Sequence, residues 1–328
     1  MEFEFVASSS FNFLTSFGEK YGIPVQGDTL HLPSTLGKGY MRRIDLDSGF
    51  KLVIHNYTLN EEFVLKRLPA DKTNEFISII FHSNEEAASL TTNGQQQQLR
   101  IARTTQFAIQ IASYDLESVI RFPAFTAINF IVIGIAAVRL KSLLALQRPN
   151  SVIQTILNVS PGFLFYESMG PDVQKTLKQL TAARQEGELS ALYYHIKVLE
   201  LMLLVFEQLL KRDQVRHSPI YKDDIDKLLI VRTAVLSDLS QPPQLAHLAK
   251  LVGLSETKLK DLFKQVFGDS IYNYYQKARM DEAAFLLKQS VYSVTDVGTQ
   301  LGFTNLSHFS RLFEKHYGVK PKKYASGG

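Results

Sequence analysis

The side chains most suited to chemistry in this sequence lie on two short amphipathic helices expected near the C-terminus. Opposite an apolar face, these helices carry the following polar groups: Thr257, Lys258, Lys260, Asp261 and Lys264 on the first, then Asn305, Ser307, His308, Arg311 and Lys315 on the second. Such side chains donate to phosphate oxygens and to the edges of bases. Most charged helix faces are only solvated surface, so an interpretation as a nucleic-acid interface depends on the elements that position these residues.

Those helices belong to a pattern that occurs twice. Residues 245–255 and 294–304 each begin with a short apolar-periodic helix that ends at a glycine, Gly253 or Gly302. The two copies align at an offset of 49 residues before the turn and of 50 after it, because the second turn has gained one residue. Glycine tolerates the left-handed backbone that a tight turn requires. The repeat predicts two helix-turn-helix units, in each of which the second helix fits a DNA major groove.

Small and capping residues support this interpretation. Ser255 in the first copy, and Asn305 or Thr304 in the second, are suited to cap the second helix. Ala249 and Gly298 occupy equivalent sites where two helices cross closely. We expect base contacts from Thr257, Lys258, Asp261, Ser307, His308 and Arg311. We expect phosphate contacts from Lys260, Lys264, Asn305 and Lys315.

The segment that joins the two copies, and the one that follows them, carry a family resemblance. The joining segment contains Arg279-x-x-x-Ala283-x-x-Leu286-Leu287, and the chain closes with Gly318-x-x-Pro321-x-x-Tyr324. With both helix-turn-helix copies, these motifs make residues 222–325 resemble the DNA-binding domain of the AraC-type bacterial transcription regulators. The sequence departs from that pattern at Ala325, where arginine is common, and at Gly298, where alanine is more usual.

The resemblance implies an organisation and a set of partners. It implies a DNA-binding domain over residues 220–328, with one helix-turn-helix at about 243–267, a linker helix at about 270–289 and the other helix-turn-helix at about 294–317. The partner would be double-stranded DNA, bound through two adjacent major-groove segments. RNA polymerase is a further partner that the resemblance allows. An activator is expected, although the sequence leaves open whether transcription rises or falls. The lack of cysteine suits a cytoplasmic location.

Residues 1–138 are expected to form short strands separated by turns. Segments such as 50–59 and 75–82 alternate or are rich in β-branched and aromatic residues, as are 99–102 and 106–112, whereas the glutamines at 95–98 are expected in a polar loop. Strands spaced this closely favour an antiparallel barrel or sandwich. In AraC-type regulators a cupin-like β-barrel at this position receives an effector. The resemblance therefore implies such a barrel, with a small molecule that stays unidentified.

The same region offers little for catalysis or metal binding. The chain has no cysteine, and His31, His55 and His82 are widely spread, with no His-x-His pair. We therefore expect no catalytic residue, no cofactor and no metal, and the chain is not expected to be an enzyme. Basic residues at Arg42-Arg43 and Lys66-Arg67 could neutralise an acidic effector, but at most one of each adjacent pair points inward from a strand. The residues that bind the effector are left unassigned.

Residues 139–215 are expected to be helical. The longest helix, over 189–212, is apolar nearly all round, with one stripe formed by Leu192, Ile196, Leu199, Leu203, Phe206 and Leu210. One side is expected to cover the barrel, while the other meets the same helix of a second subunit or completes an intramolecular core. The stretch 193–201 is similar to the corresponding helix of the siderophore-responsive (PchR-like) members of the AraC family. We predict a dimerisation segment here, and hence a homodimer.

Composition sets the outer limits. The chain has 328 residues, 45% of them hydrophobic, and a formal charge of +4. From Lys222 to the end there are 15 Lys and Arg against 11 Asp and Glu, whereas the remainder carries 21 of each, so the positive excess lies in the duplicated part. The longest apolar run, at 124–138, is shorter than the roughly 20 residues of a bilayer helix, and the N-terminus lacks a signal-peptide pattern. We therefore expect no membrane partner.

The sequence as a whole predicts an α+β protein. It would contain an N-terminal antiparallel cupin-like β-barrel, a central helical dimerisation segment and a C-terminal all-α domain with two helix-turn-helix motifs joined by a long helix. The leading hypothesis is a sequence-specific DNA-binding transcription regulator controlled by an effector in the N-terminal domain. Two alternatives stay open: a constitutive DNA-binding dimer without a ligand, and a cupin-type enzyme fused to a DNA-binding domain.

Overall fold

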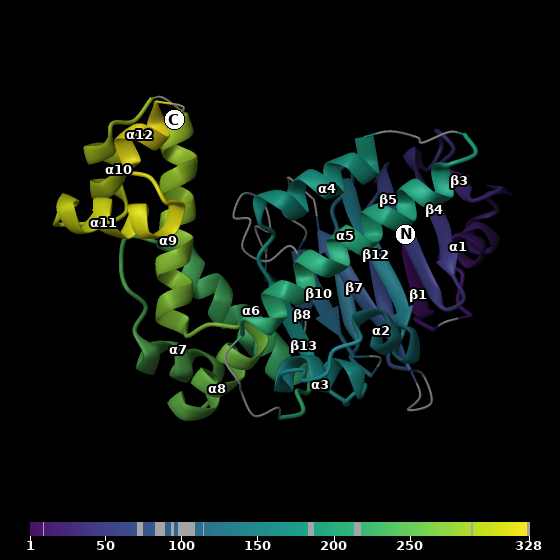
Figure 1. The fold of residues 1–328 in the computed structure, drawn as a ribbon, viewed down its shortest axis with the longest axis horizontal. Coiled ribbons are helices and arrows are strands. Elements are labelled where there is room, and N and C mark those ends of the chain that lie inside the picture. The colour runs from purple at the N-terminus through teal and green to yellow at the C-terminus, as the bar shows by residue number, and fades with distance from the viewer. Residues whose placement is uncertain are drawn as a thin grey trace. The chain divides into compact units, whose positions relative to one another are not determined.

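The protein divides into two compact units, Met1–Lys222 and Asp223–Gly328. Its structure, a computed structural model, describes residues 1–8, 10–70, 75–82, 89–92, 95–97, 109–113, 115–182, 187–212, 218–289 and 291–326 (Figure 1). The first unit combines sheets with helices and the second is helical, so the predicted α+β class is confirmed. Within the described ranges, no helix is both long enough and apolar enough to cross a lipid bilayer.

The first unit is built on two β-sheets. Its strands are β1 (Glu2–Val6), β2 (Val25–Gln26), β3 (Thr29–His31), β4 (Gly37–Asp47), β5 (Phe50–Leu59), β6 (Phe63–Leu68), β7 (Phe76–His82), β8 (Ser89–Thr92), β9 (Gln95–Gln97), β10 (Ile109–Ala112), β11 (Ser118–Phe122), β12 (Ala127–Ala136) and β13 (Leu164–Glu167). One sheet has five strands in the order β1-β6-β11-β8-β9. The other has eight, in the order β13-β10-β7-β12-β5-β4-β3-β2.

The central strands of the eight-stranded sheet are buried on both faces. In β5, Phe50, Leu52 and Ile54 enter one hydrophobic core, whereas Val53 and Tyr57 enter another. Strand β12 divides in the same way, with its odd-numbered isoleucines from 131 to 135 in the first core. Because side chains alternate across a strand, a strand that is apolar at every position must be covered twice. The two cores therefore lie on opposite faces of one sheet.

The sheets differ from the prediction in three respects. No closed barrel is found among the described strands, which form two separate sheets. Strand β1 pairs in parallel with β6, with Glu2 opposite Val64, whereas an antiparallel arrangement was expected. No hairpin joins these two strands, so no turn fixes their relative direction. The glutamines at 95–97 form strand β9, paired with β8, because ladder hydrogen bonds come from the backbone. The strand predicted at 99–102 lies outside the described residues.

Five helices belong to this unit: α1 (Phe13–Tyr21), α2 (Ala137–Leu144), α3 (Ser151–Leu157), α4 (Pro171–Ala182) and α5 (Ser190–Leu210). Helices α4 and α5 lie over one face of the eight-stranded sheet (Figure 1). Val198, Leu201 and Val205 of α5 are fully buried in the core shared with β5 and β12. The long apolar helix expected at 189–212 is therefore present as α5, and one of its sides covers the sheet.

The second unit contains seven helices among its described residues: α6 (Lys222–Ser237), α7 (Leu245–Val252), α8 (Glu256–Phe267), α9 (Ile271–Lys288), α10 (Val294–Gln300), α11 (Leu306–Tyr317) and α12 (Pro321–Ala325). Helices α7 and α8 form the first helix-turn-helix, and α10 and α11 form the second (Figure 1). The long helix α9 joins them. The expected order of two repeats and a linker helix is confirmed.

The two turn glycines provide a first prediction. Both have a left-handed backbone, but an added Cβ at Gly253 meets nothing within 4 Å, whereas one at Gly302 would lie 1.9 Å from the carbonyl oxygen of Ser240. Gly253→Ala should therefore cost only the left-handed strain of about 1–2 kcal/mol, and Gly302→Ala should cost clearly more. Urea unfolding with hydrogen exchange over α10 and α11 measures the difference. Equal losses would mean that the loop at Ser240 moves aside freely.

Candidate nucleic-acid interface

Local signals set the boundaries of the first helix-turn-helix. Helix α7 ends at Gly253, whose φ of 64° continues neither helix nor strand. The Ser255 hydroxyl then accepts the Lys258 N–H at 3.2 Å, which caps the first turn of α8. Leu259 and Phe263 of α8 are fully buried, so the opposite side of this helix faces solvent.

The second helix-turn-helix has the same arrangement with different caps. Ser293 and Asp296 form a capping box at the start of α10, each accepting the other's backbone N–H. Asn305 caps α11, because its Oδ1 accepts the His308 N–H at 3.0 Å. Of the two caps considered for this copy, Asn305 is thus the one present. Phe309 and Phe313 are fully buried behind the exposed face of α11.

Within the C-terminal unit, helix α9 contacts both helix-turn-helix motifs through buried polar groups. In the first half, the Tyr274 hydroxyl accepts from Arg232 Nε at 2.9 Å, and its ring meets Phe263 edge-on at 5.2 Å. In the second half, the Arg279 guanidinium lies 3.7 Å from the centre of the Phe303 ring and donates to the Leu301 carbonyl oxygen from Nε and Nη2. The second helices of the two motifs, α8 and α11, which we call the recognition helices, are thus tied to the same linker helix.

The ten predicted contact residues occupy α8, α11 and the cap of α11. All are exposed except Lys264, which is half-buried. Thr257, Lys260 and Asp261 share the outer side of α8, and the outer side of α11 carries Ser307, His308 and Arg311. The structure therefore brings the predicted residues together in two sets, one on each second helix, as an interface with DNA requires.

Lys258 and Asn305, two of these residues, use their side chains within the protein. Lys258 Nζ lies 2.8 Å from the carboxylate of Asp224, a buried residue of α6. The Oδ1 atom of Asn305 is occupied by the cap of α11. Sequence reasoning missed the first contact, because it joins residues 34 positions apart, whereas the cap at Asn305 is one of the two that the sequence predicts for this helix.

Comparison with known families gives a match to each unit. Residues 37–221, more than half of the chain, match the Regulatory protein PchR N-terminal domain, and residues 248–327 match a Helix-turn-helix domain. The chain belongs to the AraC family of regulators, with a PchR-type N-terminal domain. This family consists of transcription regulators and not of enzymes. The resemblance carried by the repeat and by residues 193–201 is confirmed.

Curated relatives match part of this chain. It is 29% identical over 133 residues to the HTH-type transcriptional activator RhaR of Yersinia pseudotuberculosis, which is 40% of this chain and 46% of that protein. It is 34% identical over 97 residues to an uncharacterized HTH-type transcriptional regulator of Haemophilus influenzae, covering 29% and 33% of the two chains. The chain thus spans about half or less of the length of these relatives.

Among solved structures, an AraC-type regulator from Chromobacterium violaceum is similar, with 27% identity and a TM-score of 0.30. The match covers 32% of this chain and 95% of the other. The structure of ToxT from Vibrio cholerae matches over 85% of this chain and 98% of the other, with 14% identity and a TM-score of 0.31.

The linker helix contains a positioning residue that the sequence analysis quoted without giving it a role. Arg279→Lys keeps the positive charge but loses the planar contact with Phe303 and the paired donors to Leu301. We expect it to destabilise the second helix-turn-helix by about 1–3 kcal/mol, because hydrogen bonds from charged groups contribute that much. Urea unfolding and hydrogen exchange over α10 and α11 measure this loss.

A control variant lies on the same helix. Lys288 is exposed and holds its ammonium 5.3 Å from the Tyr324 ring, so Lys288→Ala should cost less than about 1 kcal/mol. If the Arg279→Lys and Lys288→Ala variants lost equal stability, the contacts of Arg279 would not be what fixes the turn of the second helix-turn-helix.

Proposed function

We propose that this chain is a sequence-specific DNA-binding transcription regulator whose activity is set by a small molecule bound in its N-terminal unit. The observation that carries the proposal is the duplicated helix-turn-helix, in which both second helices are capped, anchored to one linker helix and exposed on their polar sides. Regulators of bacterial genes act in the cytoplasm, and an activator of this kind would also contact RNA polymerase.

The two recognition helices would enter adjacent major-groove segments on one side of the duplex, about 34 Å apart. Base readout falls to Thr257, Asp261, Ser307, His308 and Arg311, with Lys258 available once DNA competes with Asp224 for its ammonium. Phosphate contacts fall to Lys260, Lys264 and Lys315, and to the side-chain N–H groups of Asn305, whose oxygen is held in the cap.

The sharpest test of readout is Arg311→Ala. If Arg311 reads a guanine, the variant should lose about 1–3 kcal/mol of binding free energy and relax the preference at one base position. Selection from a random DNA pool with the full chain gives the preferred motif, and titration on that motif and on single-base variants measures the effect. Two short conserved blocks about one helical turn apart are expected in the wild-type motif.

The matched control is Arg148→Ala, which removes the same charge from an exposed site of the first unit. It should leave both the motif and the affinity unchanged. If Arg311→Ala weakened binding equally on every sequence and lowered the salt dependence by about one ion, Arg311 would be a phosphate contact. A pool that shows no enrichment at any effector or salt condition would contradict the proposed function itself.

We also infer that α5 forms the interface of a homodimer. Its inner side is buried, yet Leu192, Ile196 and Leu203 on its outer side are 56%, 53% and 60% exposed. With the half-buried Leu199 they follow helical spacing and form a stripe in the part of the chain that is described. The same helix of a second copy, related by a two-fold axis, is the occupant that such a self-complementary stripe fits.

Leu203→Glu tests this interface. A carboxylate on the stripe should weaken the dimer at least about tenfold, because it would be buried without a partner. Sedimentation velocity of the full chain measures the change. Val138→Glu is the control, because Val138 is an exposed apolar residue of α2, outside the stripe. A wild-type chain that stays monomeric, or a Leu203→Glu variant that dimerises normally, would exclude α5 as the interface.

The effector would enter the space between the two sheets of the first unit, in the manner expected of a cupin-like sensor. A cavity lies there and is lined by residues of both sheets. Ligand sites in proteins are concave and mostly apolar, with a few polar groups that fix the ligand's orientation. This cavity favours an effector-controlled regulator over a constitutive dimer, whose sheets would pack together without a gap.

A further inference from the structure

The cavity between the sheets has apolar walls and a basic lining. The five-stranded sheet contributes Leu65 and Arg67 of β6 together with Ile120 of β11, and the eight-stranded sheet contributes alternate residues of β5, β7 and β12. Aromatic rings are prominent on the lining: Phe5, Phe11, Phe13, Phe76 and Phe130. An apolar ligand body of aromatic or aliphatic type fits these walls.

Strand alternation decides which basic residues reach this cavity. Of the pairs Arg42-Arg43 and Lys66-Arg67, Arg43 and Arg67 line it. Arg42 lies on the other face of β4, where its guanidinium contacts the Tyr194 hydroxyl at 3.4 Å, and Lys66 pairs with Glu2 and Glu4 of β1. Alternation along a strand predicts at most one inward residue in each pair, and the structure has one in each.

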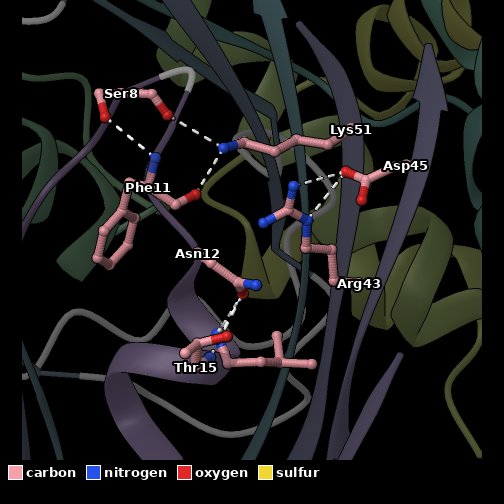
Figure 2. Close-up of polar contacts among 8 residues, drawn as sticks. Ser8, Phe11, Asn12, Thr15, Arg43, Asp45 and Lys51 are labelled. Carbon is pink, nitrogen blue, oxygen red and sulfur yellow. Dashed lines mark hydrogen bonds and ion pairs between the residues drawn. The ribbon is translucent and has the colours of Figure 1, made fainter. Parts of the chain in front are cut away.

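Two of the three cations on the lining have partners of their own (Figure 2). Lys51 donates to the carbonyl oxygens of Ser8 at 3.0 Å and Phe11 at 2.7 Å. Burial lowers the pKa of Lys51 to about 8, with the nearby charge of Arg43 adding to the effect. Arg43 itself donates from Nε and Nη2 to one carboxylate oxygen of Asp45, at 2.9 and 2.7 Å.

Arg67 differs from both. Its side chain is buried, its Nη2 donates to the Ser113 carbonyl oxygen at 2.9 Å, and its Nε has no partner among the described residues. The carboxylate of Asp115 acts on it only electrostatically, since both oxygens of that group accept the Gly162 N–H at 3.0 Å. Within the described part of the chain, Arg67 is therefore a buried cation without an ion pair.

A buried cation without an ion pair destabilises the fold, and Arg67 does not become neutral by losing its proton. Burial lowers the pKa of Arg67 to about 10, so the guanidinium stays charged at neutral pH. An unpaired charge in an apolar interior lacks both water and a counterion. A guanidinium presents parallel N–H donors that match the two oxygens of a carboxylate. A bound carboxylate would supply the counterion that the described residues do not.

A second unpartnered atom lies on the same lining. His55 is fully buried, its ring stacks on Phe130 at 4.0 Å, and its Nδ1 has no partner among the described residues. Burial lowers the pKa of His55 to about 3, so the imidazole stays neutral and can exchange one hydrogen bond with a polar ligand atom without adding charge.

We propose that the cavity between the two sheets binds an organic anion, a carboxylic acid with an aromatic or aliphatic body, whose carboxylate pairs with Arg67 and whose body lies against the phenylalanine walls. This proposal rests on the proposed function, because it names the chemical class of the effector. Among the lining cations, Arg67 is the specificity-determining one, since Lys51 and Arg43 already have partners.

The test uses matched pairs of probes on the full chain: 2-naphthoate with 2-naphthamide, biphenyl-4-carboxylate with its amide, and octanoate with octanamide. Isothermal titration should show at least one acid that binds about tenfold or more tightly than its neutral amide, because a charge-assisted pair replaces a neutral contact. Arg67→Met should abolish this preference and leave amide binding unchanged. Arg43→Met should retain it, because Arg43 already pairs with Asp45.

A lysine variant separates a binding role from a structural one. Arg67→Lys keeps the charge and loses the paired donors, so it should bind the acids more weakly than the wild type but still prefer them to the amides. Urea unfolding should show that Arg67→Met is no less stable than the wild type, because it removes an unpaired buried charge. Equal binding of every acid and its amide, or an acid preference that survives Arg67→Met, would overturn the proposal.

The same samples distinguish this proposal from the proposed function. The DNA affinity of the full chain is measured on its selected motif, with and without the acid that binds best. Specific DNA binding without Arg67-dependent acid binding would overturn the ligand class and leave the regulator. Arg67-dependent acid binding in a chain that selects no DNA motif would support the ligand class and overturn the regulator.

Discussion

The N-terminal unit depends on one constraint, the burial of its central strands on both faces. Strands β5, β7 and β12 are buried at most positions on both sides, so each face of the eight-stranded sheet needs its own cover. Helices α2, α3, α4 and α5 pack against one face. Helix α1 and strands of the five-stranded sheet pack against the other, and the cavity lies between the two sheets. A ligand site thus arises where one face of the eight-stranded sheet is not fully covered. A polar side chain that points into this cavity needs a hydrogen-bond or ionic partner there.

The C-terminal unit solves a different problem, which is to hold two recognition helices at a fixed separation. Both helix-turn-helix motifs pack against α9, and the one residue added in the second turn moves the position of the helix cap. In the first helix-turn-helix, Ser255 caps α8 two residues after Gly253. In the second, Asn305 caps α11 three residues after Gly302. In this second turn, Phe303 lies against the guanidinium of Arg279, which ties the turn to the linker helix.

Local chemistry made part of this structure predictable. Turn glycines, caps and apolar periodicity each act over a few residues, so both helix-turn-helix motifs and the linker helix follow from the sequence. Strand alternation limits the pair Lys66-Arg67 to one inward residue, and only the structure shows that it is Arg67. Pairings between distant segments leave no such signal. The parallel β1–β6 ladder, the glutamine strand β9 and the ion pair between Lys258 and Asp224 depend on which segments meet, and only the structure gives them. That Arg67 has no ion pair with any described residue is likewise invisible in the sequence before Lys222, which has equal numbers of acidic and basic residues.

A buried, unpaired arginine also sets a condition on how a ligand could control DNA binding. An anion that neutralises Arg67 stabilises the first unit by mass action, whatever the state of the second. It changes DNA affinity only if the cavity differs between the arrangements that bind DNA well and poorly, because a ligand shifts an equilibrium by its difference in affinity for the two states. Lys51 donates to the carbonyl oxygens of Ser8 and Phe11, which are part of the cavity lining. A ligand carboxylate that competed for Lys51 would release these two contacts as well as neutralise Arg67, and such a coupled change would supply the required difference.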